Sequence, residues 1–171
     1  KSPRRPGQPR GLILVPTREL ANQVHLVMAP FAAALNLRTA TIYGGVGATP
    51  QIRALKAGVD VVVACPGRLE DHLRNRDARL DAVEITVLDE ADHMADLGFL
   101  PVVNRLLEKT PRGAQRLLFS ATLDKAVDSL VQRFVPNPVT HSVDRVDETP
   151  VEMDHHVLHV GVGPLAQGHV G

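Results

Sequence analysis

A chain of 171 residues can bury one full hydrophobic core, so we expect one domain followed by a tail. Its 19 basic and 19 acidic residues cancel, so any surface for nucleic acid must be local. The single cysteine, Cys65, excludes an internal disulfide and a cysteine-based zinc cluster, and no apolar run is long enough to span a membrane. Together with a composition biased toward Ala, Val, Arg and Leu, these features favour a cytoplasmic, bacterial protein.

The chain opens with a basic segment that contains three prolines, which predicts a disordered arm or linker over residues 1–10. Five short aliphatic runs follow, each bounded by turn formers or charged residues, as is typical of strands. These runs are residues 12–15, 39–43, 59–64, 85–88 and 117–119.

Segments with helical periodicity lie between the predicted strands. The first carries apolar residues on one face, which we expect to cover the core: Leu20, Val24, Val27, Met28, Phe31 and Leu35. Pro30 lies inside this pattern and should kink the helix or end one of its turns. Further helices are predicted over residues 68–75, 100–109 and 124–134. Strands that alternate with helices predict an α/β fold, in which helices cover both faces of a parallel sheet.

The last part of the chain has weaker patterns. Residues 136–143 predict a final strand, and the polar residues 144–150 predict a linker. His155, His156 and His159 follow, but they lack a carboxylate or cysteine partner and would make a poor metal site. His72 and His93 are interpreted as solvent-facing or helix-end residues without a role.

Polar groups follow each predicted strand, and the carboxyl ends of parallel strands share one edge of a sheet. These groups are Pro16-Thr17-Arg18-Glu19, Gly44-Gly45, Cys65-Pro66-Gly67-Arg68, Asp89-Glu90-Ala91-Asp92 and Ser120-Ala121-Thr122. Turn chemistry accounts for the glycines and prolines. It does not explain why Arg18, Glu90 and Thr122 gather at the same edge, so we favour a functional edge.

The carboxylates after the fourth strand suit nucleotide hydrolysis. Mg²⁺ prefers oxygen ligands and keeps several waters, so Asp89 together with substrate phosphates could hold it. Glu90 would orient or deprotonate the attacking water. An acidic cluster alone is more often a solvated surface, and it is the preceding strand and the other groups at this edge that favour the functional interpretation.

Five motifs occur in order along the chain: PTRELA at 16–21, GG at 44–45, CPGR at 65–68, LDEADHMADLGF at 88–99 and FSAT at 119–122. Together they resemble the first RecA-like domain of DEAD-box ATP-dependent RNA helicases, over about residues 11–143. The resemblance implies ATP and Mg²⁺ as cofactors and RNA as the partner. It implies that Asp89 coordinates Mg²⁺ through water, that Glu90 is the general base, and that Asp92 pairs with Ser120 and Thr122. The RNA path would be lined by Pro16, Thr17, Arg18, Gly44, Gly45, Pro66, Gly67 and Arg68.

The residues assigned to the RNA path also suit a sugar-phosphate chain on physical grounds. Thr17 and Arg18 open a helix, where unpaired backbone N–H groups attract phosphate. The Gly44-Gly45 and Pro66-Gly67 pairs allow close approach of the backbone, and Arg68 is a potential bidentate phosphate donor. Such contacts read the backbone and predict little base preference. The alternative is that Arg18 and Arg68 are surface arginines in exposed salt bridges.

Two departures from the family affect the prediction. No Gly-x-x-x-x-Gly-Lys-Ser/Thr motif occurs in the sequence, and in the family this phosphate loop precedes the PTRELA strand. We therefore expect a sheet that lacks its first strand and phosphate loop. Cys65 stands where the family usually has threonine, which should have a small effect. Residues 151–171 would be the start of a second RecA-like domain or an unstructured tail.

These observations predict a fragment of an ATP-dependent RNA helicase, monomeric, without a membrane segment, and inactive by itself. A second hypothesis is a non-catalytic RNA-binding or regulatory module, which the missing phosphate loop favours and the intact Asp89-Glu90 pair opposes. A third is another helicase or phosphate-loop ATPase that acts on DNA, but PTRELA together with Asp-Glu-Ala-Asp argues against it.

Overall fold

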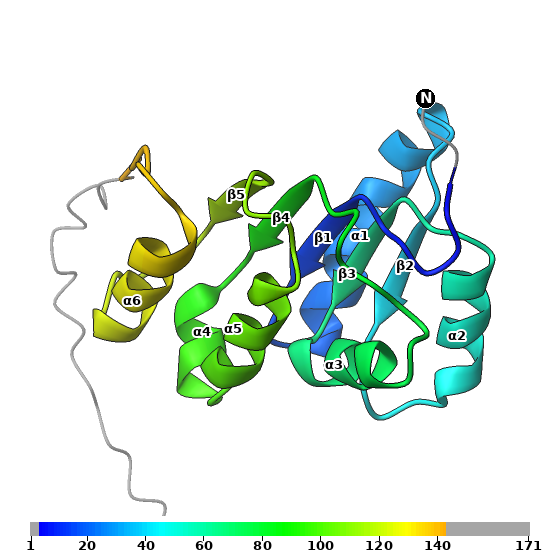
Figure 1. The fold of residues 1–171 in the computed structure, drawn as a ribbon, viewed down its shortest axis with the longest axis horizontal. Helices are drawn as coiled ribbons and strands as arrows, with labels where there is room; N and C mark the ends of the chain where they lie inside the picture. Colours follow the sequence, from blue (N-terminus) through cyan, green and yellow to red (C-terminus); the bar gives the residue numbers. More distant parts are fainter. Residues whose placement is uncertain (1–3, 143–171) are drawn as a thin grey trace, which may run out of the picture. The chain divides into compact units, whose positions relative to one another are not determined.

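A five-stranded parallel sheet forms the centre of the part that the computed structural model describes, residues 4–142. The strands are β1 (Gly11–Leu14), β2 (Thr39–Ile42), β3 (Val61–Ala64), β4 (Ile85–Leu88) and β5 (Gln115–Leu118). They lie side by side in the order β2-β3-β1-β4-β5, with every pair parallel (Figure 1). The sheet and its helices belong to one unit, Lys1–Pro138, and Val139–Gly171 form a second unit.

Five helices connect the strands, and a sixth follows β5. They are α1 (Arg18–Ala34), α2 (Ala48–Lys56), α3 (Pro66–Arg74), α4 (Ala91–Asp96), α5 (Leu100–Glu108) and α6 (Lys125–Phe134). The sequence patterns predicted α1, α3, α5 and α6, but not α2 or α4. Pro50 lies in the first turn of α2, and α4 has an acidic start and only 6 residues, features that are more typical of loops.

Alternating side chains of the strands divide the core between the two faces of the sheet. Leu12 and Leu14 of β1 are buried in the larger cluster, to which α3, α5 and α6 contribute. Ile13 and the adjoining Val15 belong to a smaller cluster on the opposite face, where α1 packs. Helices therefore cover both faces, which confirms the predicted parallel α/β sheet.

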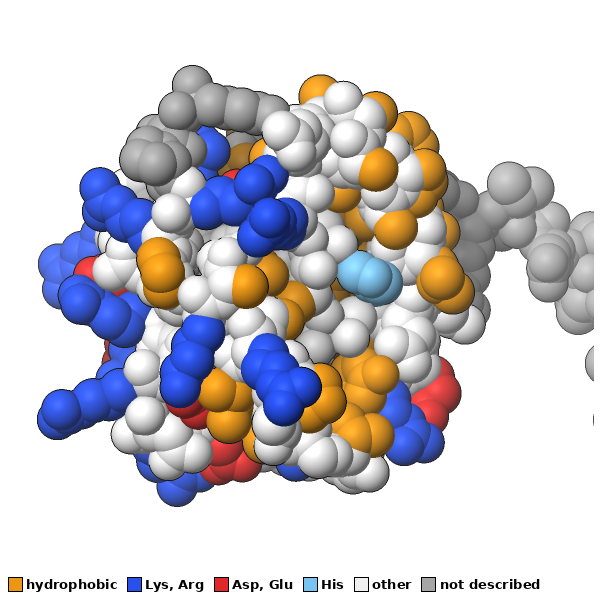
Figure 2. Space-filling view, turned by 90° about the vertical axis from the view of Figure 1, so that its right-hand side faces the viewer, with side chains coloured by type: hydrophobic (Ala, Val, Ile, Leu, Met, Phe, Trp, Pro, Cys, Tyr) orange, Lys and Arg blue, Asp and Glu red, His pale blue; other side chains and the backbone are white. Residues whose placement is uncertain are grey.

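The outer side of α1 differs from the prediction. Only Leu20, Val24 and Met28 of the predicted apolar face pack against the sheet. Val27 and Phe31 are 67% and 68% exposed, because α1 contacts the sheet along one narrow stripe and no other described helix lies on this face. Figure 2 shows hydrophobic side chains gathered on the side of the molecule where α1 lies. The helix continues past Pro30 to Ala34.

The N-terminal basic segment is ordered over residues 4–10, contrary to the predicted disordered arm. The Gly7 N–H donates to the Leu55 carbonyl at 2.9 Å, and the Arg79 N–H donates to the Gly7 carbonyl at 2.7 Å. Gly7 has a φ of +68°, and a Cβ atom there would lie 2.8 Å from the Asp77 carbonyl oxygen. Glycine is thus required for this close contact. The prolines of this segment favoured the prediction of disorder, but backbone hydrogen bonds fix the segment.

A buried carboxylate, Asp60, anchors this segment. Asp60 Oδ2 accepts hydrogen bonds from Arg4 Nε at 2.6 Å and from the Arg38 N–H at 2.8 Å. Burial by itself raises the pKa of Asp60, but the hydrogen bonds from the Arg38 N–H and from Arg4 outweigh it and hold the pKa below the ordinary aspartate value.

We expect Asp60→Ala to destabilise the chain by about 1–3 kcal/mol, because the Arg38 N–H and the Arg4 guanidinium lose their shared acceptor. Since the folded pKa is lowered, the contribution of Asp60 is complete above the ordinary aspartate pKa of about 4 and is lost as the pH falls toward the folded value. Urea unfolding of both proteins at pH 7 and near pH 3 would measure this. An equal stability difference at the two pH values would contradict it.

The end of the described region has no strand. Residues 136–142 form bends and irregular structure, so the predicted strand over 136–143 is wrong for that part, which contains two prolines within three residues. The predicted linker at 144–150 and the histidines of the segment 151–171 lie outside the described residues. Within residues 4–142, no helix combines the length and apolar character needed to cross a bilayer.

Candidate functional site

The carboxyl ends of the five strands bring all five predicted polar groups to one edge. The strand pairing continues one residue past the strands: the Val15 N–H donates to the Ala64 carbonyl and the Asp89 N–H to the Leu14 carbonyl, both at 3.0 Å. The strand order places Gly44-Gly45, Cys65–Arg68 and Pro16–Glu19 on one half of the edge. The acidic group after β4 and the hydroxyl group after β5 occupy the other half.

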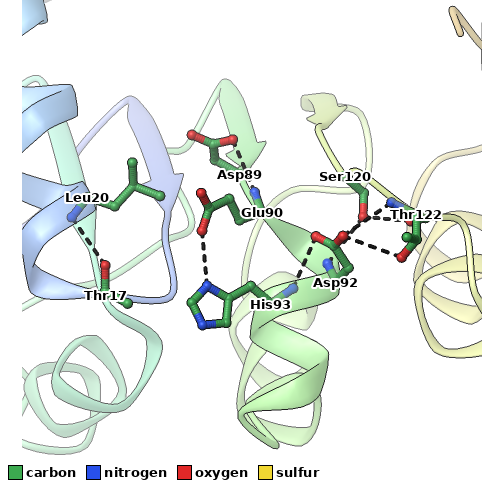
Figure 3. Close-up of polar contacts among 8 residues, drawn as sticks. All are labelled: Thr17, Leu20, Asp89, Glu90, Asp92, His93, Ser120 and Thr122. Carbon is green, nitrogen blue, oxygen red and sulfur yellow. Dashed lines mark hydrogen bonds and ion pairs between the residues drawn. The ribbon is translucent and has the colours of Figure 1, made fainter. Parts of the chain in front are cut away.

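Asp89 and Glu90 stand where β4 turns into α4 (Figure 3). Asp89 Oδ1 accepts a hydrogen bond from the Glu90 N–H at 3.0 Å. Glu90 is the N-cap of α4 and has left-handed backbone angles, φ 50° and ψ 54°. Its side chain is about half exposed, and Oε2 lies 3.1 Å from Nδ1 of His93. The carboxylate is therefore accessible to solvent and is oriented by a neighbour on the same helix.

Asp92 joins the first turn of α4 to the segment after β5 (Figure 3). Its Oδ2 accepts hydrogen bonds from the Thr122 N–H at 3.2 Å and from Thr122 Oγ1 at 3.3 Å. The Asp92 N–H donates to Ser120 Oγ at 3.2 Å, and Ser120 Oγ donates to the Thr122 carbonyl at 2.7 Å. The two motifs are thus connected by side chains as well as by strand pairing.

The electrostatics of Asp92 favour its ionised form. Burial acts to raise its pKa, but hydrogen bonds from the His93 N–H, from Ser120 and from the Thr122 N–H outweigh burial and lower the pKa. Asp92 is therefore an acceptor at neutral pH, which suits a link between two segments.

The residues after β4 and β5 could hold a magnesium ion only if waters and phosphates supplied most of its ligands. Among residues 4–142, no group of three or more His, Cys, Asp or Glu side chains is arranged to hold a metal. Asp89 offers one partly exposed carboxylate, which is the kind of hard oxygen ligand that Mg²⁺ accepts when waters and phosphates complete its shell.

The other half of the edge begins at Thr17, the N-cap of α1. Thr17 Oγ1 accepts a hydrogen bond from the Leu20 N–H at 3.2 Å, which fixes the first turn of the helix (Figure 3). Arg18 follows, and its Nε lies 3.2 Å from Glu19 Oε1 in an exposed ion pair. Gly45, after β2, has a φ of +77°, and a Cβ atom placed on it would lie 3.7 Å from Arg18 Nη1. The structure therefore brings Arg18 beside the glycine turn.

Arg68, near the start of α3, also contacts the glycine turn. Its Nη1 donates to the Val46 carbonyl at 3.0 Å. Pro66 and Gly67 form the first turn of α3, and a Cβ atom on Gly67 would meet no heavy atom within 4 Å. Gly67 is thus not required by internal packing. An open pocket borders this turn and is lined by Ala48, Arg68, Asp71, His72, Arg74 and Asn75.

Cys65 is half buried at the N-cap of α3. Burial, followed by the nearby charge of Glu19, raises the pKa of the Cys65 thiol to about 11. The thiol is therefore protonated at neutral pH, a state in which it is a poor nucleophile.

Sequence reasoning missed the contacts of two histidines near this edge. His93 contacts Glu90, although it was interpreted as having no role. His72 is buried, not solvent-facing, and it contacts Gln51 of the unpredicted helix α2. The position of His72 three residues after the buried Leu69, on the same face of α3, was the available signal.

Comparison with known proteins points in the same direction as the motifs. The profile of the DEAD/DEAH box helicase family matches residues 2–130. DEAD-box ATP-dependent RNA helicase 5 of Oryza sativa is 46% identical over 134 residues, which cover 78% of this chain and 26% of that protein. ATP-dependent RNA helicase RhlB of Xanthomonas axonopodis is 49% identical over 138 residues, covering 79% of this chain and 24% of the relative.

A solved structure gives the same result for the fold. A hypothetical ATP-dependent RNA helicase from Sulfolobus tokodaii aligns with a TM-score of 0.71 and 33% identity, over 75% of this chain and 39% of the other. The chain thus spans about a quarter of the length of the two curated relatives.

Proposed function

The chain belongs to the DEAD/DEAH box helicase family, and on that premise we propose that it contributes one part of an ATP-dependent RNA helicase. The observation that carries this proposal is the division of the sheet edge. One half holds a partly exposed aspartate and glutamate after β4, and the other half holds two arginines, a helix N-terminus and a glycine turn. We call the half with the groups after β4 and β5 the hydrolytic half. The contacts of Asp92 with Ser120 and Thr122 join its two motifs.

In the proposed hydrolysis of ATP, Glu90 accepts a proton from the water that attacks the terminal phosphate. Its carboxylate is solvent-accessible, and the backbone turn at the N-terminus of α4 presents it beside Asp89. Asp89 would hold Mg²⁺ through water, and the ion would offset phosphate charge. Asp92 would couple the position of the Asp89-Glu90 carboxylates to that of the Ser120–Thr122 segment.

In the proposed RNA path, contacts go to phosphate and sugar. Thr17 and Arg18 present the N-terminus of α1, whose backbone N–H groups favour anions. Gly44 and Gly45 are exposed and Gly67 is partly exposed, so their backbone is open to a sugar-phosphate chain. Pro66 of the same predicted path is buried in the first turn of α3. Arg18 is exposed and Arg68 is partly exposed. Both contact neighbouring protein oxygens, so phosphate would compete with Glu19 and with the Val46 carbonyl. RNA and not DNA is proposed because the similar curated proteins are named RNA helicases.

We expect RNA binding by the chain to be weak, salt-sensitive and nearly independent of base sequence. Each phosphate neutralised on a single strand contributes about −0.7 to the slope of log affinity against log salt, so two arginines imply a slope of roughly −1 to −2. Replacement of Arg18 and Arg68 by Ala should flatten this slope and lower the affinity equally for all sequences. Fluorescence anisotropy of labelled homopolymers at several salt concentrations measures both quantities.

Arg79→Ala is the matched control for this experiment. Arg79 is exposed and ion-paired, as Arg18 is, but it precedes β4 and lies away from the carboxyl-terminal edge. Arg5→Ala is a second control for the basic N-terminal segment. Loss of binding in the controls with no loss in the edge variants would place the RNA elsewhere.

A further inference from the structure

A series of hydrogen-bonded polar side chains connects α3 to Tyr43, the residue that precedes the glycine turn. His72 of α3 is 1% exposed, and its ring nitrogens lie 3.2 Å from Asp77 Oδ2 and 3.2 Å from Gln51 Oε1. Gln51 of α2 is also buried, and its Nε2 donates to the Tyr43 carbonyl at 2.9 Å. This donation orients the Gln51 amide, so that Oε1 of Gln51 and Oδ2 of Asp77 face the two ring nitrogens of His72.

The glycine turn is held by α3 at two points. Tyr43, directly before Gly44, is held from inside through Gln51 and His72. Val46, directly after Gly45, accepts a hydrogen bond from Arg68 on the surface. The Gly44-Gly45 backbone between these points has no side chains to pack, so its position depends on the two links.

Asp77, at the other end of this hydrogen-bonded series, is also held in place. The Asp77 N–H donates to the His72 carbonyl at 2.8 Å, which closes the turn after α3. Gly7 of the N-terminal segment lies against the Asp77 carbonyl. Four segments that are distant in sequence therefore meet in one network.

Burial of His72 and Gln51, beside the largely covered Asp77 side chain, costs free energy unless each polar group is hydrogen-bonded. Apolar side chains would fill the same space without that cost. A network in which each of the three side chains is hydrogen-bonded does specify a single arrangement of the segments that it joins. We propose that His72 and Gln51 are positioning residues for RNA binding, which hold the Gly44-Gly45 turn in register with Arg68 on α3. This inference rests on the proposed function, because it assumes that the turn and Arg68 contact the same RNA strand.

The test uses the 171-residue chain and three variants. Gln51→Met keeps the side-chain length but removes both contacts. His72→Asn places an amide nitrogen near the position of Nδ1, so it can reach Asp77 but not Gln51. His72→Gln extends further and can reach Gln51. Thr110→Val is the control, because Thr110 is a buried hydrogen-bonded side chain next to α5, away from this edge.

Two quantities are measured in each protein: the {1H}–15N NOE of Gly44 and Gly45 without RNA, and the affinity for labelled oligouridylate. We expect Gln51→Met and His72→Asn to lower the NOE at both glycines. Their RNA affinity should fall by about five- to tenfold, the factor that corresponds to one or two ordinary hydrogen bonds. His72→Gln should retain more affinity than His72→Asn, and Thr110→Val should change neither quantity.

Unchanged NOE values at Gly44 and Gly45 in Gln51→Met and His72→Asn would overturn the inference, whatever the RNA affinity. So would a loosened turn with unchanged affinity, provided that the Arg18 and Arg68 variants still weaken binding in the same assay. If no variant of the edge affects RNA binding, the proposed function itself fails. The NOE values, which are measured without RNA, distinguish these cases.

Discussion

Glu90→Gln is expected to lower RNA-stimulated phosphate release by roughly two to four orders of magnitude, the usual range for loss of a general base. The experiment uses a chimera in which residues 1–171 are joined to a phosphate-loop segment and a second RecA-like domain. The amide of glutamine keeps the shape of the side chain and still accepts a hydrogen bond, but it cannot take a proton from water. ATP and RNA binding should therefore persist, and the protein should accumulate with both bound.

A matched control is Glu108→Gln. Glu108 is about half exposed, as Glu90 is, but it lies at the end of α5 and carries no proposed role. Single-turnover phosphate release and equilibrium binding of a fluorescent ATP analogue separate chemistry from binding. Turnover of Glu90→Gln within a few-fold of the unsubstituted enzyme would remove Glu90 from the mechanism.

The 171-residue chain by itself should release no phosphate from ATP above background, with or without RNA. The sequence contains no phosphate-loop motif, and that loop supplies the backbone cradle and the lysine for the β- and γ-phosphates. Asp89 is one partly exposed carboxylate, and a single carboxylate holds Mg²⁺ weakly without phosphates to complete the shell.

Phosphate release by the isolated chain that rises with RNA and disappears in Glu90→Gln would contradict this expectation, because it would demonstrate a complete site. Salt-dependent RNA binding without any hydrolysis would agree with it. If the complete chimera also binds RNA but fails to hydrolyse ATP, the alternative of a non-catalytic RNA-binding module becomes the better account of the chain.

The strands were predictable from sequence because each is a short aliphatic run that ends at turn formers or charges. The predicted and observed strands agree to within two residues at each end, and parallel pairing followed from the intervening helices. The sheet edge was predictable for the same reason, since the polar groups come directly after the strands. Local sequence carries all of this information.

Features that depend on tertiary contacts were not predictable. The periodicity of α1 marks Val27 and Phe31 as apolar, but it does not say how wide a stripe the sheet will cover. The basic N-terminal segment has the composition of a disordered arm, whereas its order comes from Gly7 and Asp60, which lie 53 positions apart in the sequence. The partners of His72 come from α2 and from the turn after α3, so its burial could not be inferred from the CPGR helix alone.

The left-handed backbone at Glu90 has a consequence for protein engineering. A non-glycine residue in this conformation commonly costs of the order of 1–3 kcal/mol, and α4 has no side-chain hydrogen bond at its N-cap to offset that cost. Glycine adopts the same angles without penalty. A library selected only for thermal tolerance would therefore enrich glycine at this position and discard the carboxylate, whereas selection for turnover would keep the strained glutamate. At this position stability favours glycine, whereas activity requires glutamate.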